Sequence, residues 1–490
     1  MNLLDLFLAT AVQQPGHPLI ITARDEYTYG DFKLLVDGLI GKLKAQGVKP
    51  GDCIGLHYPN SPEYIGLVYA IWGCGACVTP IPVELNPQEK RQIFQHIAID
   101  ALLSKTNIIA DVAAVQTGED IIISEQTAFA RCIKYLEKPA GFTRLNPAFV
   151  RFTSGTTGTS KGVVLSHETV YERIQAANDG LHLDSSDRIV WLLSMAYHFT
   201  VSIVAYLTYG CTILLAPNAF GSTIIQLAAK HKATLTYAAP LHYNLMAQDQ
   251  GSQALPDLRL AIVTTAALDP AVAEAFYQRF QIPLNETYGI IEVGLPCMNL
   301  DKPREKRGSV GKLLPAYEAR LHTIDQAAGL GEIQLRGKGL IDAYYEPWQE
   351  RHDILQKNGG WFATGDLGEI DEEAYLHIRG RSKEVISVGG MKFFPQTVEA
   401  VLESHPAIQE ACVFRYPDER LGEIPHAHVV KTPGIDELPS PKDITAFCAE
   451  HLAEHKIPAQ ITFVDRLLRT ASGKLIRNAS QLQALGNMNA

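Results

Sequence analysis

Short apolar runs rich in β-branched residues alternate along the chain with longer segments in which apolar residues recur every three or four positions. The runs at 18–22, 53–57 and 212–216 predict strands, and the spacing over 31–46 predicts a helix that Gly47 can terminate. Such alternation of strands and helices is typical of layered α/β folds. We therefore predict an α/β protein with a large layered N-terminal domain.

The pattern changes near residues 380–383, a polar, glycine-bearing segment. Beyond it, the sequence predicts a compact α+β unit from two helices and two strands: helices at 396–404 and 442–454, strands at 411–414 and 427–430. We expect an N-terminal domain of residues 1–381 and a small, mobile C-terminal domain of residues 382–490.

Composition narrows the class of protein. The 490 residues are 46% hydrophobic and carry a net charge of -10, and no stretch collects Lys or Arg, so the footprint of a nucleic-acid surface is missing. No apolar run is long enough to cross a membrane, and residues 1–11 fit an amphipathic helix better than a signal peptide. The eight cysteines lack a framework spacing, which indicates reduced thiols in the cytoplasm, and we expect the Cys74/Cys77 pair to be buried by packing. The sequence indicates no oligomeric state.

The segment 152–162 is the most informative stretch, because glycines, hydroxyl side chains and a lysine follow an apolar run and precede a β-branched one. Glycines let backbone N–H groups turn inward, and hydroxyls and an ammonium add donors, which together suit phosphate oxygens. The pattern differs from the P-loop of kinases and NTPases, since Ser160 precedes Lys161 and Gly162 follows it.

At these residues the chain resembles the superfamily of acyl-adenylate-forming enzymes, which includes acyl-CoA synthetases, peptide-synthetase adenylation domains and luciferases. The resemblance recurs in order along nearly the whole chain, at the segments 59–61 with 73–80, 288–292, 331–337 with 364–367, 380–384 and 469–474. It implies an enzyme that joins a carboxylic acid to the AMP of ATP, releases pyrophosphate and passes the acyl group to a nucleophile.

The resemblance also implies roles for single residues. Lys474 would stabilise charge on the α-phosphate during attack by the carboxylate, and Glu292 would bind Mg²⁺, which prefers oxygen ligands. Asp366 and Arg381 would hydrogen bond the ribose, and Tyr288 would border the adenine. The remaining ATP-binding residues are expected to be Thr153, Ser154, Gly155, Thr156, Thr157, Gly158 and Lys161.

Two departures from the family pattern bear on the substrates. Ile291 stands where a Thr hydroxyl commonly touches phosphate, which puts one phosphate contact in doubt, and the sequence around Thr264 replaces a small glycine-rich loop. The bulkier side chains favour a compact acid. The acyl pocket is expected to comprise Tyr197, His198, Thr264, Thr265, Ala266, Gly289 and Ile290.

His198 occupies the position at which amino-acid-activating relatives carry an aspartate for the substrate ammonium. A largely neutral imidazole cannot replace that counter-ion. We therefore expect an acid without an α-amino group, with His198 gating the carboxylate site; a satisfied core histidine is the alternative.

Lys383 occupies the position that the resemblance identifies as a hinge. Rotation there would withdraw Lys474 and bring the glycine-bearing segment 388–392 to the acyl-adenylate, where a pantetheine arm could enter. CoA is therefore the acceptor we favour, and a carrier-protein thiol or an amine remain alternatives.

The sequence leaves two other classes of protein open. The segment 451–455 reads H-x-x-E-H, the spacing of inverted zinc proteases, but no companion acidic ligand follows. A catalytically inactive binding module is the second alternative, motivated by Ile291.

Overall fold

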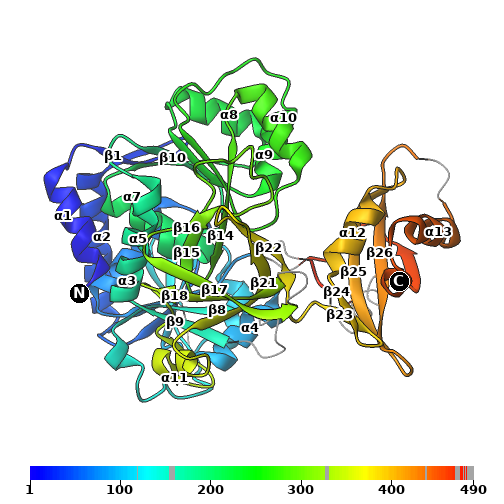
Figure 1. The fold of residues 1–490 in the computed structure, drawn as a ribbon. Coiled ribbons are helices and arrows are strands. Elements are labelled where there is room, and N and C mark those ends of the chain that lie inside the picture. The colour runs from blue at the N-terminus through cyan, green and yellow to red at the C-terminus, as the bar shows by residue number, and fades with distance from the viewer. Residues whose placement is uncertain are drawn as a thin grey trace. The chain divides into compact units, whose positions relative to one another are not determined.

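The structure is a computed structural model that describes residues 1–117, 120–153, 161–325, 330–435, 439–469, 475–477, 479 and 482. These residues form two compact units (Figure 1). The larger unit contains residues 1–320, 334–363 and 370–377, and the smaller unit contains residues 321–333, 364–369 and 378–490. The predicted α/β class is confirmed.

Two nine-stranded sheets organise the larger unit. The first has the order β16 (Lys312–Leu313), β15 (Gly294–Met298), β14 (Leu284–Ile290), β13 (Leu260–Val263), β12 (Leu235–Ala238), β10 (Arg188–Trp191), β11 (Thr212–Leu215), β1 (Pro18–Ile21) and β2 (Glu26–Thr28). Within this sheet, β1, β11, β10, β12, β13 and the start of β14 pair in parallel with their neighbours. Antiparallel pairs occur only at the two ends of the sheet. Parallel strands are buried on both faces, which explains their continuous apolar runs.

The second sheet contains the strands that flank the glycine-rich segment. Its order is β20 (Gln349–Glu350), β19 (Ala343–Tyr344), β9 (Lys161–Ser166), β8 (Pro147–Thr153), β4 (Cys77–Pro80), β3 (Cys53–His57), β5 (Ala101–Lys105), β7 (Thr127–Arg131) and β6 (Ile121–Ser124). Strands β8 and β9 are antiparallel and end in the pair Thr153↔Lys161, so their backbones close the base of the loop that joins them.

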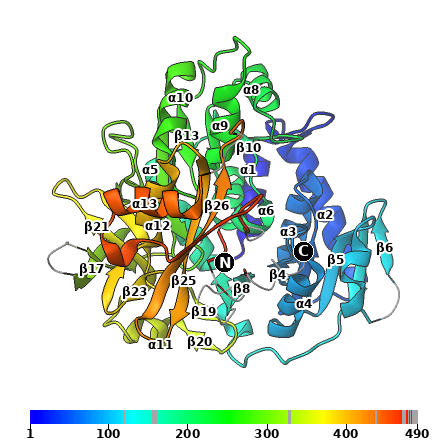
Figure 2. The ribbon, with the colours of Figure 1, turned by 90° about the vertical axis from the view of Figure 1, so that its right-hand side faces the viewer.

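The helices of the larger unit are α1 (Leu3–Gln13), α2 (Tyr29–Ala45), α3 (Pro62–Gly73), α4 (Pro87–His96), α5 (His167–Leu181), α6 (Met195–His198), α7 (Val204–Thr208), α8 (Gly221–Lys230), α9 (Pro240–Gln248), α10 (Pro270–Phe280) and α11 (Arg351–Gln356). Helix α2 contacts β1 of the first sheet, α3 contacts β4 of the second, and α2 packs on α3, so these helices lie between the sheets. Helices α8, α9 and α10 lie side by side along the first sheet (Figure 2).

A four-stranded sheet has the order β17 (Tyr317–Asp325), β18 (Leu330–Gly337), β21 (Phe362–Ile370) and β22 (Leu376–Arg381). Beyond β22, the smaller unit contains β23 (Ile386–Val388), β24 (Met391–Phe393), α12 (Pro395–Glu403), β25 (Ile408–Asp418), β26 (Gly422–Lys431), α13 (Pro441–His451) and β27 (Gln460–Phe463). Helices α12 and α13 contribute Val398, Leu402 and Ile444 to a core that also takes Val413 and Val429 from the β25–β26 hairpin.

All eight cysteines are free thiols and buried, as expected for Cys74 and Cys77. No helix in the described part of the chain has the length and apolarity that a bilayer span requires.

Candidate functional site

The predicted acyl-pocket residues gather at one edge of the first sheet. They follow β10 and β13 or end β14, and the carboxyl ends of parallel strands meet at one edge, where α/β proteins bind ligands. The ring centroids of His198 and Tyr237 lie 6.2 Å apart, and the Tyr237 hydroxyl donates to Thr264 Oγ1 at 3.4 Å. The structure thus brings both His198 and Thr264 next to Tyr237, a residue that sequence reasoning had not selected.

The segment that carries Tyr197 and His198 is anchored from the turn that precedes α3. Helix α6 runs into a π-helical turn, Phe199–Ile203. The Met195 backbone N–H donates to Asn60 Oδ1 at 2.8 Å, and Asn60 Nδ2 donates to the Leu193 carbonyl at 2.8 Å. Asn60, part of the early motif noted in the sequence, therefore fixes the start of the segment that presents His198.

Thr265 and Ala266 are exposed in the loop after β13, and Thr265 has a backbone φ of 77°. This left-handed conformation is unfavourable for a β-branched residue. At the end of β14, Gly289 and Ile290 complete the predicted set. A side chain at position 289 would place Cβ 2.5 Å from the Gly294 carbonyl oxygen, so close backbone packing requires glycine there.

Glu292, the predicted metal ligand, lies in the turn between β14 and β15. Its backbone carbonyl accepts a hydrogen bond from Ile341 N at 2.7 Å, which fixes the turn. Burial together with the charge and hydrogen bond of the Glu292 carboxylate raises the pKa of Tyr344 far above its ordinary value. Tyr344 therefore stays protonated and can orient the carboxylate. Tyr288 is buried on β14, four residues before Glu292.

Arg151 is a charged residue in the apolar strand β8 that the sequence reasoning missed. Its Nη1 donates to the Tyr197 carbonyl at 2.6 Å, and its guanidinium carbon lies 5.0 Å from the centre of the Tyr197 ring. Burial lowers the pKa of Arg151, while Tyr197, Glu292 and Tyr64 oppose that effect. The signal was visible as a lone cation in the run Pro147–Thr153.

Two further predicted residues meet within the smaller unit. Arg381 Nε lies 3.0 Å from Asp366 Oδ1, and Asp366 is 4% exposed. The backbone supports this pair, because Ser382 N donates to the Gly365 carbonyl at 2.9 Å. Lys383 lies in the next turn, which is closed by a hydrogen bond from the Glu384 N–H to the Arg381 carbonyl. A carboxylate and a guanidinium side by side suit a ligand with vicinal hydroxyls.

Several predicted residues lie outside the described ones: Ser154, Gly155, Thr156, Thr157, Gly158 and Lys474. Of Thr153 and Lys161 only the backbone is described, as the pair that ends β8 and β9.

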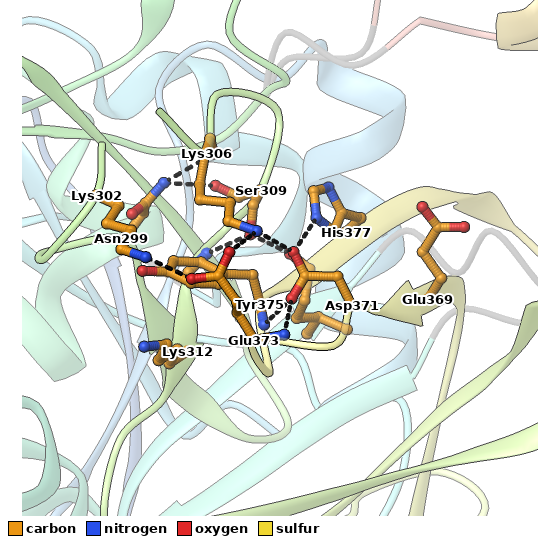
Figure 3. Close-up of polar contacts among 12 residues, drawn as sticks. Asn299, Lys302, Lys306, Ser309, Lys312, Glu369, Asp371, Glu373, Tyr375 and His377 are labelled. Atoms are coloured by element: carbon orange, nitrogen blue, oxygen red, sulfur yellow. Dashed lines mark hydrogen bonds and ion pairs between the residues drawn. The ribbon is translucent and has the colours of Figure 1, made fainter. Parts of the chain in front are cut away.

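A basic cluster elsewhere in the larger unit is already neutralised (Figure 3). Lys306 Nζ lies 2.8 Å from Asp371 Oδ2 and 2.7 Å from Glu373 Oε1, while Lys302 pairs with Glu373 and Lys312 with another carboxylate. Hydrogen bonds from Lys306 lower the pKa of Asp371. The cluster is therefore a structural ion-pair network, not a phosphate site.

The metalloprotease alternative fails on geometry. Helix α13 was predicted to continue to residue 454 but ends at His451, because Leu452 is extended. His451 and His455 therefore do not share a helix face, and the described residues contain no group of three or more His, Cys, Asp or Glu side chains suited to a metal. His451 contacts the backbone carbonyl and the ring of Phe447, and His455 packs against the ring of Phe393.

Two family models match the chain. Residues 7–345 match the family model of the AMP-binding enzymes, and residues 397–474 match that of the AMP-binding enzyme C-terminal domain. The chain is 28% identical to a 2-succinylbenzoate–CoA ligase of Bacillus licheniformis, over 94% of the chain and 99% of that protein. It is 28% identical to an indoleacetate–CoA ligase of Aromatoleum aromaticum, over 94% of each.

Among solved structures, the chain resembles the o-succinylbenzoate CoA synthetase of Bacillus subtilis in complex with its acyl-adenylate intermediate. The TM-score is 0.83 at 25% identity, over 97% of the chain and 98% of that protein.

Proposed function

Because the chain belongs to the AMP-binding enzyme family, we propose that it is an ATP-dependent acid–thiol ligase that makes an acyl-adenylate and transfers the acyl group to CoA. In the first step a carboxylate oxygen attacks the α-phosphorus of ATP and pyrophosphate leaves. In the second the CoA thiol, losing its proton, attacks the acyl carbon and AMP leaves. The observation behind this proposal is likeness to CoA ligases over 94% of the chain.

The described residues fit these steps. Asp366 and Arg381, 3.0 Å apart, would bind the ribose of ATP, and Tyr288 would border its adenine. Glu292, oriented by Tyr344, offers the hard oxygen ligand that Mg²⁺ prefers, and Mg²⁺ when bound would neutralise phosphate charge. Lys474 would stabilise the transition state of adenylation, and loss of one such donor lowers turnover by about 10²- to 10³-fold.

We place the acid near His198, Tyr237 and Thr264. The relatives in the comparison act on 2-succinylbenzoate and indoleacetate, which are carboxylic acids without an α-amino group. The same class is expected here, since no carboxylate replaces the imidazole at position 198. The eight free cysteines are consistent with a reducing, cytoplasmic location.

Acid-dependent exchange of labelled pyrophosphate into ATP tests the first step. Fatty, aryl and small cyclic acids should be compared, and at least one should support exchange that Lys474→Ala abolishes. The best acid is then incubated with ATP and CoA, with a carrier protein or with amines, and products are identified by mass spectrometry. An acyl-CoA supports the proposal, whereas an amide or a loaded carrier would change the acceptor. No exchange with any acid would indicate an inactive binding module, as Ile291 suggested.

A further inference from the structure

No carboxylate in the described part of the chain forms an ion pair with the Arg151 guanidinium, although the charge of Glu292 reaches it. Its hydrogen bond goes to a neutral carbonyl, that of Tyr197, and its Nε is buried with no hydrogen-bond partner among the described residues. A desolvated guanidinium is costly unless an anion accepts its hydrogen bonds. An arginine kept in this condition therefore points to an anion that the protein receives from outside.

A second unpartnered donor lies close by. The Tyr64 side chain on α3 is fully buried, and its hydroxyl has no partner among the described residues. Burial raises the pKa of Tyr64, and the charge of Arg151 opposes that rise, which places the two groups within electrostatic reach. The Tyr64 ring packs 5.8 Å from Phe199, next to His198 in the same segment. A neutral hydroxyl donor beside a cation is a suitable pair for one carboxylate.

The strand indicates which substrate supplies the anion. Residues two apart on a strand point to the same face, and Phe149 of β8 packs 5.8 Å from Phe199. Arg151 accordingly faces the segment of Tyr197 and His198, which lines the acyl side of the site. It lies over the Tyr197 ring rather than within the loop that follows Thr153.

Resting on the proposed function, we propose that Arg151 and Tyr64 bind a second anionic group of the acid, so that the substrate is a dianion such as a dicarboxylate. The reacting carboxylate would remain near His198, and the second group would be held by the Arg151 guanidinium and the Tyr64 hydroxyl. Arg151 is then a residue that determines specificity.

Matched acids test this proposal in pyrophosphate exchange. Succinate and phthalate are compared with their monomethyl esters, which keep the shape and lose one charge. The wild-type enzyme should use at least one diacid with a kcat/KM about 10-fold or more above that of its ester. Arg151→Met should lower kcat/KM for the diacid about 100-fold and change that for the ester less than about 3-fold, and Arg151→Lys should keep part of the preference. Tyr64→Phe should lower kcat/KM for the diacid and leave kcat/KM for the ester unchanged. Arg144→Met removes an exposed arginine that pairs with Glu350 and serves as the control.

Other outcomes would overturn the proposal. Exchange with the esters and no preference for diacids would do so while leaving the ligase function intact, whereas no exchange with any acid would remove the function itself. Equal losses for diacid and ester in Arg151→Met would mean that Arg151 only supports Tyr197. A higher KM for ATP with every acid would assign Arg151 to phosphate. If Arg151→Met does not fold, the wild-type preference, Arg151→Lys and Tyr64→Phe still decide.

Discussion

Thr265 illustrates how one residue can carry strain beside the proposed acyl site. It is exposed, yet its φ is 77°, which costs a β-branched residue about 1–3 kcal/mol. Thr265→Gly should relieve this strain, and the added chain entropy of glycine should cancel about 0.5–1 kcal/mol of the gain. We expect a net stabilisation of about 1 kcal/mol in urea unfolding.

The neighbouring residue is a matched control. The backbone φ of Thr264 is not positive, its side chain is half-buried, and its hydroxyl accepts a hydrogen bond from the Tyr237 hydroxyl at 3.4 Å. Thr264→Gly should therefore destabilise the protein by about 1 kcal/mol, because it loses a contact and gains chain entropy. Equal effects of the two substitutions would show that the backbone at 265 stores no strain.

Glu286 should make stability depend on pH. Burial raises the pKa of Glu286 from 4.5 to about 7. The hydrogen bond that the Gly308 N–H donates to Glu286 Oε1 at 2.7 Å offsets only part of that rise. Between these two pH values the folded chain holds a proton that the unfolded chain has lost, so the stabilisation present below 4.5 is lost as pH rises through about 7. At about 1.4 kcal/mol per pKa unit, the loss is at most about 3 kcal/mol.

Glu286→Gln isolates this effect. Glutamine stays neutral and still accepts the Gly308 N–H, so the variant should gain stability over the wild type as pH rises. Urea unfolding at about pH 5 and about pH 8 should show a difference between the two proteins that widens by about 2–3 kcal/mol. Parallel pH profiles would contradict the assignment.

The segments of His198, Glu292, Asp366 and Arg381 could be proposed from the sequence because the motifs that carry the family resemblance are local. Partners that come from distant segments were not accessible in this way. Tyr344 interacts with the Glu292 carboxylate although it lies 52 residues further along the chain. Arg151, on β8 of the second sheet, contacts Tyr197, which follows a strand of the first sheet. Such pairings follow from sheet order, which a local pattern does not contain.

At the scale of elements, the turn after β22 is the proposed hinge. Lys383 lies between Ser382, whose N–H donates to the Gly365 carbonyl, and Glu384, whose N–H donates to the Arg381 carbonyl. Proline at position 383 fixes φ at about −65° and restricts the residue before it. If the turn must change conformation between the two steps, Lys383→Pro should preserve one half-reaction and lower the other by about 10²-fold.

Single-turnover assays separate the half-reactions: acyl-adenylate formation from ATP and acid, and thioester formation from purified acyl-adenylate and CoA. Lys383→Ala keeps backbone freedom and should retain both rates within about 3-fold. Equal loss of both steps in the proline variant, with Lys383→Ala active, would argue against a hinge at this position.

Element boundaries show where local patterns suffice. The strand at 53–57 was predicted with both ends correct, and α2 was predicted within two residues, since Gly47 ends it with a φ of 75°. Helix α13 was predicted three residues too long because its apolar spacing continues past His451, where the backbone becomes extended. The order β12-β10-β11-β1 in the first sheet joins strands far apart in the chain, which no local pattern specifies.

At the scale of the whole molecule, the chain forms two units that are not contiguous in sequence. The smaller one takes in residues 321–333 and 364–369 besides 378–490. The predicted division at residue 381 rests on a local change of pattern, which indicates only the place in the chain where one domain would give way to the next. It does not reveal which earlier strands pack with the later ones, because that depends on contacts between distant segments.

The distribution of tryptophan allows the unfolding of the two units to be compared. All four tryptophans lie in the larger unit: Trp72, Trp191, Trp348 and Trp361. Fluorescence therefore reports on that unit, whereas far-UV circular dichroism reports on both. Leu402 is fully buried in the core of the smaller unit, and Leu402→Ala should cost that unit about 2–5 kcal/mol. If each core holds its own unit together, the variant should move part of the dichroism transition to lower urea and leave the fluorescence midpoint unchanged. Leu214→Ala, in a core of the larger unit, should move the fluorescence midpoint instead. A fluorescence shift of the same size in both variants would mean that the chain unfolds as one cooperative body.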